Sequence, residues 1–159
     1  MTRGDNDGFV VSPERAMHRR TLLSVSLLAL PFGMAPGSAR AQDAAKKLRV
    51  VVQVSEADPA RWNLVLNNVK NLQDDLGAAN VEIEVVAYGP GIGMLKLDAV
   101  SNSRVSDAIK AGVKVAACEN TMRNQKLARA DMHPNVSYVP AGVTEIVQRQ
   151  RDGWAYLRP

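Results

Sequence analysis

The chain has 159 residues but a single cysteine, Cys118, so it cannot form an internal disulfide. It also has only two histidines, His18 and His133, and one of them precedes the predicted mature chain. One cysteine and one distant histidine do not make a zinc site without carboxylates or a second chain. The sequence therefore predicts neither a disulfide framework nor a metal site, and it carries no motif that calls for a cofactor.

Clusters of basic residues are scarce after the first forty positions. From Gln42 onward there are 15 Lys and Arg residues against 13 Asp and Glu residues, which leaves a net charge of +2. The one short basic run, residues 46–49, lies at the start of this part and fits a flexible entry segment. A nucleic-acid-binding surface needs a basic patch or stripe, so nucleic acid is not expected as a partner.

The N-terminal apolar run is too short to act as a stable membrane anchor. It covers only residues 21–30 and is broken by Pro31, whereas a membrane-spanning helix needs about 20 apolar residues. Basic residues stand before it, namely Arg15, His18, Arg19 and Arg20. Ala39-Arg40-Ala41 then gives a small-x-small cleavage site before Gln42. We therefore predict an export signal over residues 1–41 that is removed, and a periplasmic mature protein.

The residues around the arginine pair indicate the export route. Arg19-Arg20-Thr21-Leu22-Leu23 resembles a twin-arginine signal, although His18 stands where Ser or Thr is usual. A general secretory signal is the alternative. Met17 lies directly upstream and provides an alternative start, in which case residues 1–16 would not belong to the natural protein.

Strand and helix patterns alternate along the rest of the chain, after a polar lead-in at residues 42–47. Apolar, β-branched runs predict strands at 48–54, 81–88, 113–118, 136–139 and 154–157. Helical spacing, caps and glycine stops predict helices at 59–76, 98–111, 121–130 and 143–151. The clearest helix begins at Asp58-Pro59 and ends at Gly77. Five strands alternating with four helices predict an α/β domain with a mostly parallel sheet over residues 48–159.

In such sheets ligands bind beyond the carboxyl ends of the strands. Three segments are expected at that edge, at residues 55–58, 89–93 and 118–121. The second contains Gly89, Gly91 and Gly93 but lacks the G-x-G-x-x-G spacing of dinucleotide-binding motifs. We therefore favour close backbone packing, or a flap over Cys118, as the interpretation of this segment rather than a nucleotide site. The run 149–151 is expected to be a solvated helix face.

Cys118 is the main candidate for chemistry, because it stands where a buried strand ends and a helix begins. Asn120 or Thr121 is expected to cap that helix. Backbone N–H groups at a helix N-terminus lower the pKa of a thiol and favour the nucleophilic thiolate. A buried structural cysteine is the alternative. His133 lies at the far end of the predicted helix, about 15 Å away for ten residues, so a Cys–His dyad is not expected.

The same residues carry a resemblance to a known family. Ala117-Cys118-Glu119-Asn120-Thr121-Met122 between a strand and a helix, followed by Tyr138-Val139-Pro140-Ala141-Gly142-Val143, resembles the DsrE/DsrF-like sulfur-relay superfamily. The opening strand and the Tyr88-Gly89-Pro90-Gly91 loop fit the same pattern, so the resemblance covers nearly all of residues 48–159.

The resemblance implies a flavodoxin-like, three-layer subunit that assembles into trimers or hexamers. It also implies that Cys118 accepts sulfur as a persulfide and exchanges it with donor and acceptor proteins, with Asn120 and Thr121 shaping its loop. The resulting hypothesis is an exported sulfur-binding or sulfur-transfer protein that uses Cys118. The alternative is a non-enzymatic oligomeric binding or scaffolding domain with a structural cysteine.

Overall fold

A computed structural model of the protein describes residues 47–159. The predicted export signal, the alternative start at Met17 and residues 42–46 of the lead-in lie outside the described residues. Within the described part, no helix combines the length and the apolar character needed to cross a membrane.

The described chain builds one five-stranded sheet in which every neighbouring pair of strands is parallel. The strands are β1 (Leu48–Val54), β2 (Val81–Ala87), β3 (Lys114–Cys118), β4 (Ser137–Val139) and β5 (Ala155–Leu157), and their order is β4-β3-β2-β1-β5. Parallel strands buried on both faces explain why the sequence shows apolar runs rather than strict alternation. The predicted α/β class is confirmed, and the three layers are consistent with a flavodoxin-like fold.

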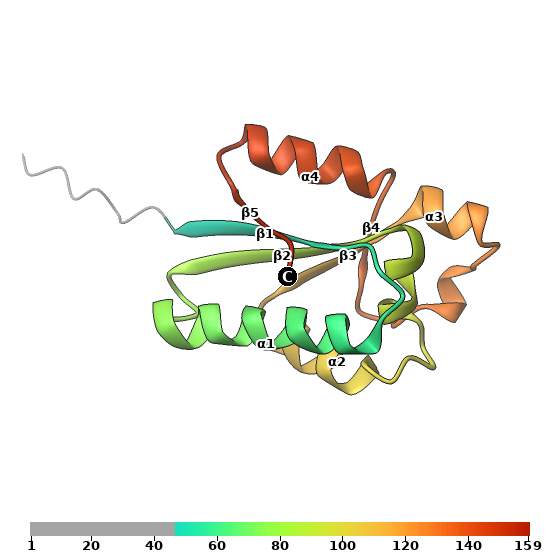
Figure 1. The fold of residues 1–159 in the computed structure, drawn as a ribbon, viewed down its shortest axis with the longest axis horizontal. Coiled ribbons are helices and arrows are strands. Elements are labelled where there is room, and N and C mark those ends of the chain that lie inside the picture. The colour runs from blue at the N-terminus through green and yellow to red at the C-terminus, as the bar shows by residue number, and fades with distance from the viewer. Residues whose placement is uncertain (1–46) are drawn as a thin grey trace, which may run out of the picture. The chain divides into compact units, whose positions relative to one another are not determined.

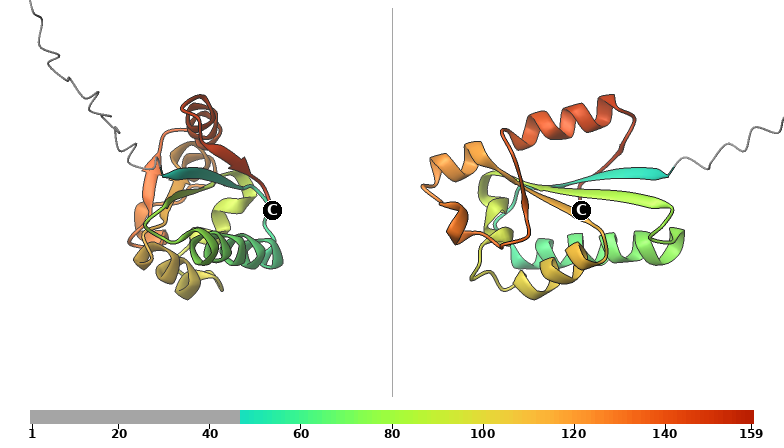
Figure 2. Two further views of the ribbon diagram at one scale, coloured as in Figure 1. Left: turned by 90° about the vertical axis from the view of Figure 1, so that its left-hand side faces the viewer. Right: turned by 180° about the vertical axis from the view of Figure 1, so that it is seen from behind.

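Helices cover both faces of the sheet (Figures 1 and 2). The helices α1 (Pro59–Leu76) and α2 (Asn102–Lys110) lie on one face, and α4 (Gly142–Arg151) lies on the other. The chain advances from β1 to β4 in one direction and then returns across the sheet to β5. Right-handed crossovers in opposite directions place their connections on opposite faces, which accounts for the position of α4.

The first helix follows its sequence signals closely. The Asp58 carboxylate accepts a hydrogen bond from the Ala60 N–H at 2.9 Å, Pro59 opens the helix, and Gly77 ends it with φ of +82°. Only glycine adopts that backbone conformation at little cost, so the helix stops where it was predicted to stop.

Two predicted helices are shorter than expected. The helix predicted at 98–111 begins only at Asn102, after a turn. The helix predicted at 121–130 is a short α3 (Glu119–Asn124), followed by the 3₁₀ helix η2 (Arg129–Asp131). Cys118 itself occupies the N-cap of α3, so the expectation of Asn120 or Thr121 as the cap was wrong.

The glycine-rich segment is a 3₁₀ helix, η1 (Gly89–Leu95), rather than an irregular loop. A Cβ atom on Gly91 would lie 2.4 Å from the Val54 carbonyl oxygen, so this glycine lets η1 pack against the end of β1. A Cβ on Gly93 would lie 3.3 Å from the Trp62 ring. Gly89 has φ of +52°, which favours glycine. Close backbone packing therefore explains this glycine-rich segment.

The two faces of the sheet differ in how they are held. The face covered by α1 and α2 belongs to a cluster of 21 buried apolar residues among those described, whereas the α4 face has six. The α4 face also buries Glu84, which has no exposed area and pairs with Lys114 at 2.8 Å and Arg149 at 2.5 Å. The prediction that residues 149–151 form a solvated helix face is therefore wrong for Arg149. The helix α4 is held partly by ion pairs.

We predict that Gly91→Ala destabilises the protein by at least about 2 kcal/mol, because the added methyl group collides with backbone rather than with a movable side chain. Urea unfolding of the mature chain measures the loss. Gly93→Ala is the matched control, since its methyl group meets only the rim of the Trp62 ring and should cost clearly less. Equal losses for the two variants would contradict this account of the η1 packing.

Candidate functional site

Cys118 is the last residue of β3, at the carboxyl edge of the sheet where β3 and its neighbour β4 end. At this edge the chain passes from β3 directly into α3. From β4 it passes into α4, on the face of the sheet opposite α1 and α2. Such a divergence of neighbouring connections is the usual place for a ligand site in open α/β sheets. The structure therefore places Cys118 where the sequence predicted it.

The first residue of α4 contacts the sulfur directly. The Gly142 N–H donates a hydrogen bond to the Cys118 Sγ over 3.2 Å. A Cβ atom on Gly142 would lie 3.0 Å from the Tyr88 Cβ and 3.3 Å from the Cys118 Cβ, so a side chain here would have to push the helix away. The absence of a side chain lets the N-terminal end of a ten-residue helix approach the thiol.

Thr121 lies on the other side of the site and is buried. Its hydroxyl oxygen accepts a hydrogen bond from the Gly89 N–H at 2.9 Å, and Gln125 donates to the Gly89 carbonyl oxygen at 3.1 Å. The first residue of η1 is thus tied to α3 and its C-cap through both its N–H and its carbonyl group. Because its oxygen already accepts, the Thr121 hydroxyl has its own proton available for the sulfur.

Asn120 acts through its backbone rather than its side chain. Its N–H donates to the Pro140 carbonyl oxygen at 3.2 Å, which joins the start of α3 to the segment between β4 and α4. Its side-chain amide is exposed and accepts a hydrogen bond from Arg123. The structure therefore brings Cys118 and Thr121 together, while the Asn120 side chain points to a neighbour on its own helix.

Opposing effects set the pKa of the Cys118 thiol. Burial raises this pKa, because it disfavours the charged thiolate. A hydrogen bond from the Thr121 hydroxyl lowers it, and backbone N–H groups of Gly142, Thr121 and Asn120 lower it further. Together the hydrogen bonds outweigh burial, so the pKa lies below that of an ordinary cysteine. A lowered pKa increases the fraction of nucleophilic thiolate at neutral pH.

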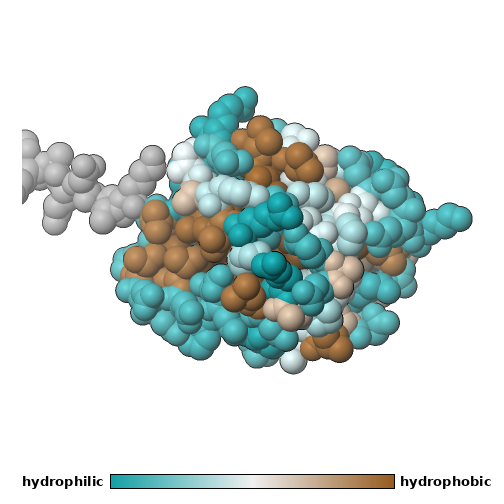
Figure 3. Space-filling view, in the orientation of Figure 1, coloured by the Kyte–Doolittle hydropathy of each residue, from teal (hydrophilic) through white to brown (hydrophobic). Residues whose placement is uncertain are grey.

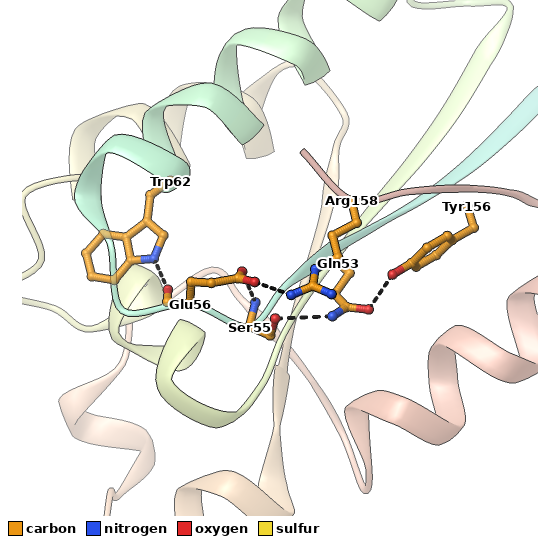
Figure 4. Close-up of polar contacts among 6 residues, drawn as sticks. All are labelled: Gln53, Ser55, Glu56, Trp62, Tyr156 and Arg158. Carbon is orange, nitrogen blue, oxygen red and sulfur yellow. Dashed lines mark hydrogen bonds and ion pairs between the residues drawn. The ribbon is translucent and has the colours of Figure 1, made fainter.

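Tyr88, which packs against Gly142, connects this site to a polar network at the end of β1. Burial raises the pKa of the Tyr88 hydroxyl. Tyr156 and Glu56 raise this pKa as well, whereas Arg158 and Ser55 lower it. The network is drawn in Figure 4 and consists of Gln53, Ser55, Glu56, Trp62, Tyr156 and Arg158.

Side chains of the C-terminal segment close this network. The Tyr156 hydroxyl donates to the Gln53 side chain at 2.6 Å, and Arg158 forms an ion pair with Glu56 (Figure 4). The Trp62 indole N–H donates to the Glu56 carbonyl oxygen at 2.8 Å. These contacts fasten the end of the chain beside the carboxyl end of β1.

The thiol itself is well covered. Cys118 is 4% exposed, and two surface hollows of about 370 and 540 Å³ are lined by other residues. Within residues 47–159, no three His, Cys, Asp or Glu side chains gather as a metal site would require. His133 is buried elsewhere, where Ser106 lies 2.7 Å from its Nε2 and the Asn135 N–H donates to its Nδ1.

Gly142 and Tyr88 are the site residues that the sequence did not single out for this role. Both lie in segments that carry the family resemblance, and each follows a strand on the same edge of the sheet as Cys118. The sequence did offer one indication of this close backbone approach. A glycine stands at the start of a helix, separated from the preceding strand only by Pro140-Ala141.

Solved structures with the same fold include two proteins described as being of unknown function and one further protein. A protein of Methanobacterium thermoautotrophicum, MTH1491, is 42% identical, with a TM-score of 0.68 over 71% of this chain and 100% of that one. BT1422 of Bacteroides thetaiotaomicron is 12% identical, with a TM-score of 0.58 over 70% and 94%. The ychN protein of E. coli is 11% identical, with a TM-score of 0.57 over 72% and 99%.

No curated protein matches the chain. The model of the DsrE/DsrF-like family matches residues 46–159, which includes β1 to β5 and the whole Cys118 site. The expectation drawn from the Cys118 motif is confirmed at the level of the family. The chain belongs to the DsrE/DsrF-like family.

Proposed function

We propose that the protein is an exported sulfur-binding or sulfur-transfer protein in which Cys118 accepts sulfane sulfur as a persulfide. The observation that carries the proposal is the set of hydrogen-bond donors around the Cys118 sulfur, with the Gly142 N–H at 3.2 Å. Membership of a family of sulfur-relay type supports the same chemistry. Donor and acceptor proteins would be its partners.

The proposed transfer needs no oxidant or reductant. The Cys118 thiolate attacks the outer sulfur of a donor persulfide, the S–S bond of the donor breaks, and the donor thiolate leaves with the bonding electrons. Cys118 then carries the persulfide, which an acceptor thiolate attacks in the same way to regenerate the Cys118 thiolate. The Gly142 N–H and the Thr121 hydroxyl stabilise the negative sulfur before the transfer and after it.

The burial of Cys118 favours a second function, an oligomeric binding or scaffolding domain with a structural cysteine. At 4% exposure the sulfur can be attacked only after a local opening or by a reagent that fits the edge of the sheet. Reactivity of the native thiol therefore separates the two functions.

We predict that the native thiol is alkylated by iodoacetamide with a midpoint at lower pH than the same thiol in urea, because the folded site stabilises the thiolate. Thr121→Val should raise the native midpoint by about 0.5–1 pH unit through loss of one hydrogen bond. Asn124→Ala, an exposed change on the same helix, is the control.

Polysulfide treatment followed by intact mass measurement tests the persulfide itself. One added sulfur on the native protein, absent in Cys118→Ser, is the expected result. A native thiol that resists both alkylation and polysulfide would reject the sulfur-transfer function and leave the scaffolding function.

We propose that the chain assembles as a trimer or hexamer. In support, α4 presents Val143 and Val147 to solvent, one turn apart and 56% and 58% exposed, and apolar surface is visible over α4 in Figure 3. Native mass spectrometry of the mature chain should give three or six subunits, with smaller species in Val147→Glu. A monomer in the unmodified chain would contradict this proposal.

We propose periplasmic localisation through the segment before Gln42. Its support is the sequence order of basic residues, apolar run and Ala39-Arg40-Ala41. Fractionation of cells expressing the full chain should place a product beginning at Gln42 in the periplasm. Changing Arg19 and Arg20 to lysine should block export if the twin-arginine route is used, and export that persists would indicate the general secretory route. An uncleaved product in the cytoplasm would contradict export.

A further inference from the structure

The sheet surface beneath α4 has three levels, and Cys118 belongs to the last of them. Along β3 the side chains of Lys114, Ala116 and Cys118 point towards α4, as the period of two in a strand requires. Lys114 is paired in register with Glu84 of β2, and Ala116 with Val86. The levels therefore run from a charged pair through an apolar pair to the thiol.

The helix α4 lays one stripe of residues over these three levels. Gly142, Ile146 and Arg149 follow the spacing i, i+4, i+7, which places them on one face of a helix. Gly142 contacts Cys118, Ile146 lies in the apolar cluster with Val86 and Ala116, and Arg149 pairs with Glu84. The seven-residue separation from Gly142 to Arg149 corresponds to about 10 Å along the helix axis.

The charged level is bound more closely than a surface ion pair. Glu84 has no exposed area, and its two oxygens face Lys114 at 2.8 Å and Arg149 at 2.5 Å. Glu145 adds a contact to Arg149 at 2.9 Å and one to Lys114 at 3.9 Å. The Arg149 guanidinium also lies over the buried Trp154 ring, 4.7 Å from its centre.

Few other contacts fix the height of α4 along the strands. Only six buried apolar residues form the cluster on this face among the described residues, and of these only Ile146 lies within α4. Apolar packing tolerates sliding more readily than a buried carboxylate tolerates losing its cations. The ion pairs of Glu84 are therefore the main polar contacts that hold the later turns of α4 against the sheet, while the Asn120–Pro140 hydrogen bond holds the segment just before its first residue.

We propose that Glu84 and Arg149 are positioning residues for Cys118, holding α4 at the height at which the Gly142 N–H reaches the sulfur. The proposal rests on the proposed function, because it matters only if the Cys118 thiolate is the working group. Neither residue touches the sulfur, and both act through the rigid body of α4.

The decisive experiment uses the mature chain with Glu84→Gln, which keeps the shape of the side chain and removes its charge. Arg149→Lys keeps the charge but loses the planar fork, and Glu145→Gln removes only the outer carboxylate. The alkylation midpoint of Cys118 should rise by about 0.5–1 pH unit in Glu84→Gln, and by less in the other two. Hydrogen exchange at the Gly142 amide should accelerate in the same order.

Val69→Ala is the matched control for destabilisation. Val69 is 1% exposed in the larger cluster, on the opposite face of the sheet from α4. It should lower stability to urea while leaving the alkylation midpoint and the Gly142 exchange unchanged. A midpoint that moves equally in Val69→Ala would show that Glu84 acts only on stability, and would overturn the proposal.

The remaining outcomes distinguish failure of the positioning role from failure of the proposed function. If the wild-type midpoint lies below that in urea but stays fixed in folded Glu84→Gln, the positioning role fails and the proposed function stands. If Glu84→Gln does not fold, Arg149→Lys and Glu145→Gln decide, and unchanged midpoints in both reject the role. If the wild-type thiol shows no lowered midpoint, the proposed function fails and the positioning role fails with it.

Discussion

The hydrogen bond from the Gly142 N–H to the Cys118 sulfur depends on where two neighbouring strands send the chain. After β3 the backbone turns at once into α3, while after β4 it crosses to the other face and begins α4. Both helices therefore start beside the same sulfur, and the glycine at the start of α4 leaves room for the approach. The lowered pKa of the thiol and the packing of Tyr88 against Gly142 both follow from that arrangement.

Burial and activation act against each other at this thiol. Removing a sulfur from water raises its pKa, and only donors that are already in place reverse the effect. The Thr121 hydroxyl is such a donor because the Gly89 N–H holds its oxygen, and the Gly142 N–H is such a donor because α4 is anchored at Glu84. A covered thiolate of this kind is protected from unselective oxidation.

The charged level beneath α4 is better explained by the placement of the helix than by stability. Replacing buried ion pairs with apolar residues is often neutral or stabilising, so stability alone gives little reason for Glu84. The buried Glu84 carboxylate must keep its cations Lys114 and Arg149 close, whereas the small apolar cluster on this face would allow α4 to slide. Specificity of placement is therefore what these charges contribute.

The sequence alone determined the strands, the class of the fold, the N-terminal cap of α1 and the location of Cys118 at a strand end, because these depend on local periodicity and on turn residues. It misplaced the start of the helix after that strand and the surroundings of Arg149, because side-chain burial depends on what another segment brings. Only the tertiary structure decided that Gly142, 24 residues away, would reach the sulfur, and that Glu84 would lie beneath α4. Such contacts join segments from different crossovers, and no local pattern in the chain encodes the distance between them.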